Sequence, residues 1–421
     1  MTTGPPPVPL FRDGRYVRVW LVGWFTGIVR WLDLLAYGIF AFEITGSPFL
    51  VAVLALVRFL PLALFSLPFG AAGDSLSPRR IVFWSSVGVL IATTSLLFVQ
   101  LTVGLSYWHL ILGVLASGIY WASDMPLRRK MVGEIAGPDR LARAMSLDYA
   151  TSNGTRLFGP LLGGVIYQAV GMTGVLGIGI LLYAISAWLA AGILPTGGKR
   201  GGAFRPSHVV VGALRAARRA VRSNDVGCIL AVTVVFNLFG FPFVSMIPVI
   251  GEEVLGLSPS AIGFVSSTEG AFSLLSLALI GVFARDGFFR RLYFSGLAVH
   301  LAAVAFIGLA PGLWALYAGL AVAGFATSGF AVMQATLIYA VAPKGMRGRY
   351  LGLMSICIGA GVIGFANVGW MAEAFGAKWA LVIMAAEGAV AATVLALSWK
   401  ALWAEAGTRQ AVSRPLYWPR S

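Results

Sequence analysis

The chain has 421 residues, of which 58% are hydrophobic and 11% are charged. An average soluble domain carries about 25% charged residues, so this composition excludes an ordinary soluble globule. The 52 glycines follow no collagen-like period and suit helices that pack closely in lipid. The net charge of +15 could suggest a nucleic-acid partner, so its location along the chain decides its meaning.

Apolar runs long enough to cross a bilayer follow one another along most of the chain. A hydrocarbon core of about 30 Å needs about 20 apolar residues in a helix, whose backbone groups are paired internally. The sequence therefore predicts an all-α membrane protein with twelve transmembrane helices. We expect the spans at 18–44, 48–73, 79–103, 107–127, 141–170, 172–194, 226–250, 259–284, 291–310, 312–342, 348–375 and 378–403.

A polar stretch near the middle separates two groups of six spans. Arg215, Arg218, Arg219 and Arg222 stand in it at helical spacing, which indicates a basic amphipathic helix on the inner leaflet. We expect no removable signal peptide in the proline-rich start. The predicted parts are a cytoplasmic N-terminal segment at 1–17, a first bundle at 18–194, a linker at 195–225, a second bundle at 226–403 and a cytoplasmic tail at 404–421.

Lys and Arg are concentrated on one side of the predicted spans. The connections and terminal segments on that side hold 27 of the 31, whereas the opposite connections hold only Lys378. The positive-inside rule therefore predicts that both termini are cytoplasmic. Because topology accounts for the net charge, we expect a multi-pass protein of the cytoplasmic (inner) membrane with no nucleic-acid partner.

The two halves of the chain repeat. GAAGDSLSPRR at 70–80 and GVFARDGFFRR at 281–291 each carry a Gly, an Asp and a final Arg pair, at an offset of 211 residues. The segments that begin at Arg140 and Arg347 echo each other at an offset of 207. These matches predict two pseudo-symmetric six-helix bundles, an arrangement that in transporters encloses a site near the midplane.

The first repeated segment resembles the signature that the major facilitator superfamily carries between its helices 2 and 3. Its Asp, at a helix boundary, can pair with either Arg and hold the cytoplasmic side shut. The resemblance implies the fold of that superfamily and transport by alternating access. The predicted conformational latch consists of Gly70, Asp74, Arg79, Arg80, Asp286, Arg290 and Arg291.

Within that superfamily the chain is similar to the exporter branch that includes enterobactin exporters and macrolide and tetracycline efflux proteins. The similarity rests on Pro126 and Arg128, and on NGTRLFGPLLGGV at 153–165 with its Asn153 and Arg156. One departure is that helix 4 lacks the mid-membrane Arg of the proton-antiporter signature. Because Gly-Pro loosens a helix and small residues allow close approach, we predict a hinge at Gly159, Pro160, Gly163 and Gly164.

Ionisable residues inside the spans are few, and each costs enough free energy to need a partner or a task. Asp33 can meet Arg30 on one helix face, whereas Glu269 has no cation near it in sequence. We predict both carboxylates as proton-coupling or substrate-binding groups; the alternatives are a structural ion pair for Asp33 and a partly wetted helix end for Glu269. The other candidates are Arg30, Arg58, Asp124, Asn153, Arg156, Asn237, Gln334 and Asn367. Of these, we expect Asp124 to pair with Arg128.

Two further patterns concern helix shape and aromatic side chains. FNLFGFPFVSMIP at 236–248, with Pro242 and Pro248, predicts a kinked helix that gates the outer side. Tryptophans near span ends are typical interface anchors. We expect that position for Trp20, Trp24, Trp31, Trp108 and Trp121.

The sequence contains no catalytic, P-loop or metal-binding pattern, since its three His and two Cys are scattered. We therefore predict no enzyme activity, no cofactor and no metal. The expected function is proton-coupled export of an amphipathic or lipophilic small molecule, drug-like or siderophore-like, by a monomer in the lipid bilayer. The alternatives are a facilitator or importer of an organic anion without proton coupling, and a non-transporting sensor or scaffold.

Overall fold

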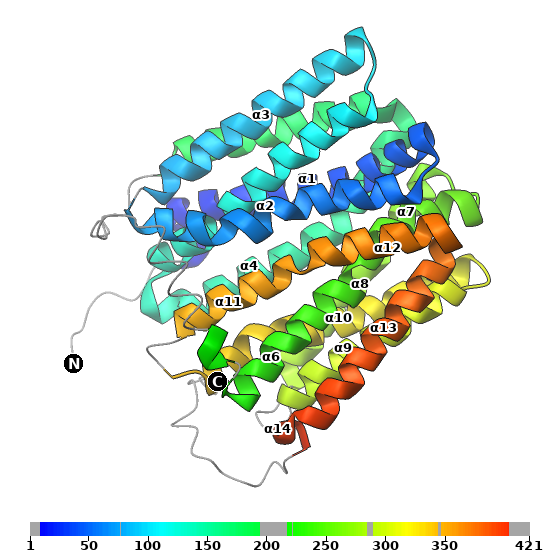
Figure 1. Ribbon diagram of the computed structural model, residues 1–421. Helices are drawn as coiled ribbons and strands as arrows, with labels where there is room; N and C mark the ends of the chain where they lie inside the picture. Colours follow the sequence, from blue (N-terminus) through cyan, green and yellow to red (C-terminus); the bar gives the residue numbers. More distant parts are fainter. Residues whose placement is uncertain are drawn as a thin grey trace.

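The computed structural model describes residues 9–75, 77–193, 217–220, 222–283, 289–343 and 347–403. Helices form the regular structure of these residues and gather into two halves, which Figure 1 shows in blue to green and in green to red. The first half contains η1 (Leu10–Arg12), α1 (Gly14–Thr45), α2 (Pro48–Ser75), α3 (Pro78–Thr102) and α4 (Tyr107–Ala191).

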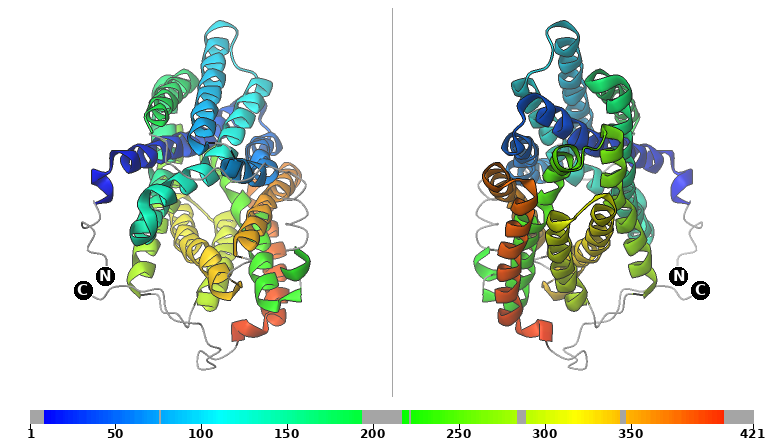
Figure 2. Two further views of the ribbon diagram at one scale, coloured as in Figure 1. Left: turned by 90° about the vertical axis from the view of Figure 1, so that its left-hand side faces the viewer. Right: turned by 90° about the vertical axis from the view of Figure 1, so that its right-hand side faces the viewer.

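The second half begins with α6 (Asn224–Val235) and ends in the short α14 (Lys400–Trp403). Figure 2 shows from two further sides that its helices lie together below those of the first half. Between α6 and α14, the longer helices are α8 (Pro259–Phe283), α9 (Phe289–Leu309), α10 (Leu313–Val341), α11 (Arg347–Gly359), α12 (Gly361–Phe375) and α13 (Ala377–Ser398).

The spans follow the hydropathy of the sequence. Eleven helices of the described chain are long and apolar enough to cross a membrane, and one of them, Asp139–Ala191, has 53 residues. That is more than twice the length that a bilayer needs. α4 bends at Gly137 and Gly171, where φ is 67° and 66°. It thus supplies the fourth, fifth and sixth predicted spans, and the predicted all-α fold of two six-helix bundles is confirmed.

The bend at Gly171 gives a first testable prediction. We expect Gly171→Ala to lower the free energy of unfolding by about 1–3 kcal/mol, because its φ of 66° and ψ of −160° are nearly closed to residues with a Cβ. Gly177→Ala is the matched control: Gly177 is helical with open space around it, so alanine should raise stability by up to about 1 kcal/mol. Thermal unfolding of the purified variants checks this, and equal effects contradict it.

The seventh span is irregular where its prolines fall. α6 passes into a π-helical turn, η2 (Phe236–Gly240), a 3₁₀ turn, η3 (Phe241–Ser245), the short α7 (Met246–Val249) and a second π-helical turn, η4 (Ile250–Val254). Proline lacks the N–H that a regular helix needs and crowds the preceding turn. The predicted kink is confirmed, and its action as a gate stays a prediction.

Connections between spans alternate between the two ends of the bundle, because consecutive spans run in opposite directions. Five connections at one end turn at a glycine with positive φ: Gly46, Gly104, Gly171, Gly256 and Gly376. We call this the glycine-turn end. We call the other the basic end, because Arg79, Arg80, Arg140, Arg290 and Arg291 of the described residues lie there.

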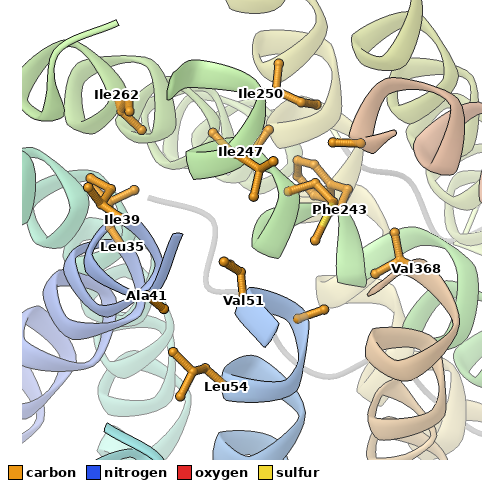
Figure 3. Close-up of a cluster of buried hydrophobic side chains, with 14 of the residues drawn as sticks. Leu35, Ile39, Ala41, Val51, Leu54, Phe243, Ile247, Ile250, Ile262 and Val368 are labelled. Atoms are coloured by element: carbon orange, nitrogen blue, oxygen red, sulfur yellow. The ribbon is translucent and has the colours of Figure 1, made fainter. Parts of the chain in front are cut away.

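A buried hydrophobic cluster joins the two halves at the glycine-turn end. Figure 3 shows Ile39 and Val51 of the first half lying near Ile247 and Val368 of the second half. At the basic end, the described residues form two separate clusters, one made entirely of first-half side chains and one of second-half side chains. The halves therefore share a hydrophobic core at the glycine-turn end and have their own cores at the basic end.

Candidate functional site

An ion pair in the middle of the molecule joins the two halves. Arg156 lies on α4 in the first half and Glu269 on α8 in the second, and Arg156 Nε lies 3.0 Å from Glu269 Oε2. Their side chains are 11% and 6% exposed. The helices come this close because a glycine follows Glu269; a Cβ at Gly270 would lie 2.6 Å from the carbonyl carbon of Arg156. Glu269 is therefore a paired, buried carboxylate rather than a wetted helix end.

Aromatic rings surround the guanidinium of Arg156. Its Cζ lies 4.7 Å from the centroid of the Trp31 ring and 5.8 Å from that of Phe241. A cation over an aromatic face gains electrostatic free energy, most strongly over indole. The expectation that Trp31 anchors the membrane interface is wrong, because the ring lies under this buried cation instead.

A cavity opens beside the ion pair. Arg156, Ser266 and Glu269 form its polar wall, and side chains from both halves, including Trp31, Phe243 and Leu320, form its apolar walls. A mostly apolar pocket with a few charged groups is the usual form of a small-molecule site. Because α1, α4, η3, α8 and α10 all contribute, any relative movement of the two halves reshapes it.

A second, smaller cavity lies next to the first, and Leu34 lines both. Asp33 and Arg58 are its charged residues, and both are buried. Arg58 Nη2 donates to the backbone oxygen of Arg30 at 2.9 Å, and among the described residues Asp33 forms no ion pair within 4 Å. The predicted contact between Arg30 and Asp33 is therefore wrong.

Arg30 instead belongs to a charged network inside the first half. Its Nη2 lies 3.9 Å from Asp124 Oδ2, and its Cζ lies 4.5 Å from the centroid of the Trp121 ring, which is thus no interface anchor either. The predicted pair of Asp124 and Arg128 is confirmed, since Arg128 Nε lies 3.2 Å from Asp124 Oδ2. Arg128 also donates to Asp148, the carboxylate that completes the network.

A neutral contact crosses between the halves one turn from the ion pair. Ser273 of α8 donates its hydroxyl to Asn153 Oδ1 of α4 at 2.8 Å, and Ser273 and Ser328 hydroxyls lie 2.7 Å apart. The sequence indicated Asn153 but neither serine, because serines are too frequent in such spans for a single one to stand out.

The other amides predicted for the cavity make contacts inside the second half. Asn237 Nδ2 donates to Thr233 O at 2.8 Å, and Gln334 Nε2 donates to Thr233 Oγ1 at 3.1 Å. Asn367 Nδ2 donates to Glu387 Oε2 at 2.8 Å. None of the three amides is part of the lining of the two cavities described above.

Part of the predicted latch can be followed at the basic end. Arg79 donates to the backbone oxygen of Ala191 at the end of α4, and Arg290 Nη2 lies 2.6 Å from Asp225 Oδ2. Arg80 and Arg291 are exposed. The side chains of the other latch residues, Gly70, Asp74 and Asp286, lie outside the described part of the chain, so the latch itself stays a prediction.

The predicted hinge residues lie where α4 approaches its neighbours. The backbone is helical from Gly159 to Gly164, and the bends of α4 fall at Gly137 and Gly171. A Cβ at Gly163 would lie 2.9 Å from Leu32 O of α1, and one at Gly164 would lie 2.9 Å from Gly263 Cα of α8. Pro160 lines the larger cavity. These small residues allow close helix contacts; hinge motion at Gly159 and Pro160 stays a prediction.

A buried histidine lies near the ion pair without being part of it. His300 Nδ1 of α9 lies 3.1 Å from Thr327 Oγ1 and 3.2 Å from Ala323 O. Phe236 packs against its ring, with centroids 4.8 Å apart. No group of three or more His, Cys, Asp or Glu gathers within the described residues, so no metal site is assigned.

Comparison with known proteins identifies the family. The family model of the Major Facilitator Superfamily matches residues 19–299 and 252–414. YfiS of Bacillus subtilis (strain 168), an uncharacterized MFS-type transporter, is 24% identical over 396 residues, which cover 89% of this chain and 91% of YfiS. The multidrug resistance protein MdtH of Shigella flexneri is 25% identical over 280 residues, which cover 64% of this chain and 66% of MdtH.

A solved structure has the same fold. The crystal structure of a bacterial homologue of the human lysosomal transporter Spinster, in an inward-facing and unoccupied conformation, superposes with a TM-score of 0.72. The two chains are 16% identical, and the match covers 93% of this chain and 98% of the other. With the family match over both halves, this chain belongs to the major facilitator superfamily of membrane transporters.

Proposed function

We propose that this transporter exports amphipathic or lipophilic small molecules in exchange for protons by alternating access. The observation that carries the proposal is the ion pair of Arg156 and Glu269, which joins the two halves at the wall of a largely apolar cavity. The resemblance to the exporter branch supports this function, as does the similarity to a protein named for multidrug resistance.

In this proposal both termini and the basic end face the cytoplasm, in agreement with the positive-inside rule. The shared hydrophobic cluster then closes the external side, and the separate clusters leave the cytoplasmic side free to open. This conformation suits uptake of a substrate from the cytoplasm or the inner leaflet. The apolar walls favour lipophilic compounds.

The carboxylates Glu269 and Asp33 couple proton entry to export of the small molecule. An ionised Glu269 holds Arg156 across the interface, whereas a protonated Glu269 is neutral and holds it much less strongly. Protonation from the external side therefore loosens the contact between α4 and α8, and proton release restores it. Asp33, buried beside Arg58 in the neighbouring cavity, is the second proton-exchanging carboxylate.

The experiment uses proteoliposomes with an imposed pH gradient and ethidium as the transported probe. We expect Glu269→Gln and Asp33→Asn each to lower gradient-driven transport by at least about tenfold, because neither amide exchanges a proton. Glu253→Gln, at an exposed carboxylate, is the matched control and should transport at the rate of the natural protein. Wild-type rates for both cavity variants under the gradient would contradict the coupling assignment.

A specific observation favours a second candidate, a facilitator of organic anions. Arg58 is 2% exposed, lines the smaller cavity, and its Nη1 finds no hydrogen-bond acceptor among the described residues. A carboxylate of a substrate could occupy that position. This candidate predicts transport of a lipophilic carboxylate that is independent of the pH gradient and is lost in Arg58→Met.

A further inference from the structure

At the glycine-turn end, each half caps the start of a helix that belongs to the other half. Gln168 of α4 accepts a hydrogen bond at Oε1 from the backbone N–H of Ser260 in the first turn of α8, at 3.0 Å. Glu373 of α12 accepts at Oε2 from the backbone N–H of Phe49 in the first turn of α2, at 3.3 Å, and from the hydroxyl of Ser47, at 2.8 Å. The first N–H groups of a helix have no partner within it, and a side-chain oxygen stabilises them.

The two caps occupy equivalent positions of the internal repeat. The capped residues, Phe49 and Ser260, are 211 residues apart, which is the offset of the repeated sequence segments. The local caps repeat at the same offset, since Ser47 Oγ accepts from Leu50 N at 3.2 Å and Ser258 Oγ accepts from Ala261 N at 3.4 Å.

A close helix contact accompanies each cap. One turn before Gln168, Gly164 packs against α8. A Cβ added at Gly164 would lie 2.9 Å from Gly263 Cα. One turn before Glu373, Gly369 packs against α2, where its Cβ would lie 2.6 Å from Ala52 Cβ. Gly164 and Gly369 are 205 residues apart, as are Gln168 and Glu373, so a small residue and a capping oxygen recur together.

We propose that Gln168 and Glu373 form a reciprocal pair of contacts that keeps the glycine-turn end closed. We call each of these two capping contacts a latch, as distinct from the latch predicted at the basic end. Both caps cross between the halves, so their three hydrogen bonds break when this end opens. The shared hydrophobic cluster beneath them, with Ile39, Ile247 and Val368, separates in the same movement. Loss of one latch therefore raises the population of the open state at both contacts between the halves, α4 with α8 and α12 with α2. The proposal does not depend on the substrate, the coupling ion or the direction of transport.

Hydrogen exchange of the purified full-length protein tests the proposal, because exchange of a protected amide follows the population of the open state. The readouts are peptides that cover 47–52 and 258–263. We expect Glu373→Ala to raise exchange about fivefold in 258–263, a segment that Glu373 does not contact. A factor of about five corresponds to the usual loss of stability when one helix cap is removed. Gln168→Ala should do the same in 47–52.

Two variants serve as controls. Ser258→Ala removes the local cap of α8 without removing a contact between the halves, so it should raise exchange in 258–263 alone. Glu373→Gln keeps a capping oxygen, as Gln168 has naturally, and should change exchange less than twofold. Both latch side chains are exposed, so their replacement leaves no cavity. If each alanine variant affects only the segment that it caps, the two caps are independent and the reciprocal latch is disproved.

Discussion

Arg156→Ala should lower the free energy of unfolding by about 3–5 kcal/mol, the usual cost of removing one partner from a buried ion pair. The variant leaves Glu269, 6% exposed, buried without its cation. It also removes the guanidinium that lies over Trp31. We expect gradient-driven transport to be abolished as well, because the pair is the charged contact between α4 and α8 at the wall of the cavity. Chemical unfolding in one detergent and proteoliposome transport give the two measurements.

The matched variants separate stability from coupling. Glu269→Gln alone leaves Arg156 charged but able to donate to the new amide, so its cost should be smaller. Arg156→Ala with Glu269→Gln should recover most of the lost stability, because no uncompensated charge stays buried, while transport stays abolished. A double-mutant cycle over the four proteins gives the interaction free energy of the pair. A value near zero would show that the two side chains do not act together and would remove the basis of the coupling mechanism.

The distance between these partners along the chain explains why the sequence did not pair them. Arg156 and Glu269 stand 113 residues apart in different halves. Hydropathy identifies the spans, but it does not fix the rotation of each helix or the contacts between bundles. Asp124 and Arg128 were predictable because side chains four residues apart are neighbours on the surface of one helix. The assignment of Arg30 to Asp33 used the same local rule and failed, because a partner on another helix, Asp124, lies closer.

The fold was more accessible to sequence reasoning than the site, because burial of apolar residues in lipid leaves few alternatives to long helices. The repeat offset of 211 residues proved accurate, since α2 and α8 begin at Pro48 and Pro259. The aromatic residues were harder to assign. A tryptophan near a span end is usually an interface anchor, and only the packing around Arg156 reveals that Trp31 lines a cavity instead.

Arg128→Leu should also lower the free energy of unfolding by about 3–5 kcal/mol, through a charged network that lies entirely within the first half. Arg128 lies between two carboxylates, Asp124 and Asp148, which are 0% and 5% exposed. Its guanidinium also fills the space beside Gly23, where a Cβ would lie 2.7 Å from Arg128 Cζ. Leucine provides no positive charge, so two buried carboxylates lose their principal partner. Thermal unfolding and denaturant titration of the purified protein measure the loss.

The neighbouring arginine provides a matched control for burial. Arg129 also pairs with Asp148, at 3.2 Å, but its side chain is 39% exposed. Arg129→Leu should therefore cost no more than about 1 kcal/mol, as for other solvent-screened ion pairs. Combining Arg128→Leu with Asp148→Asn should restore part of the stability, because one uncompensated charge is removed. If Arg129→Leu proves as costly as Arg128→Leu, the burial of an ion pair does not determine its contribution to the stability of this network, and the charge argument for the first half fails.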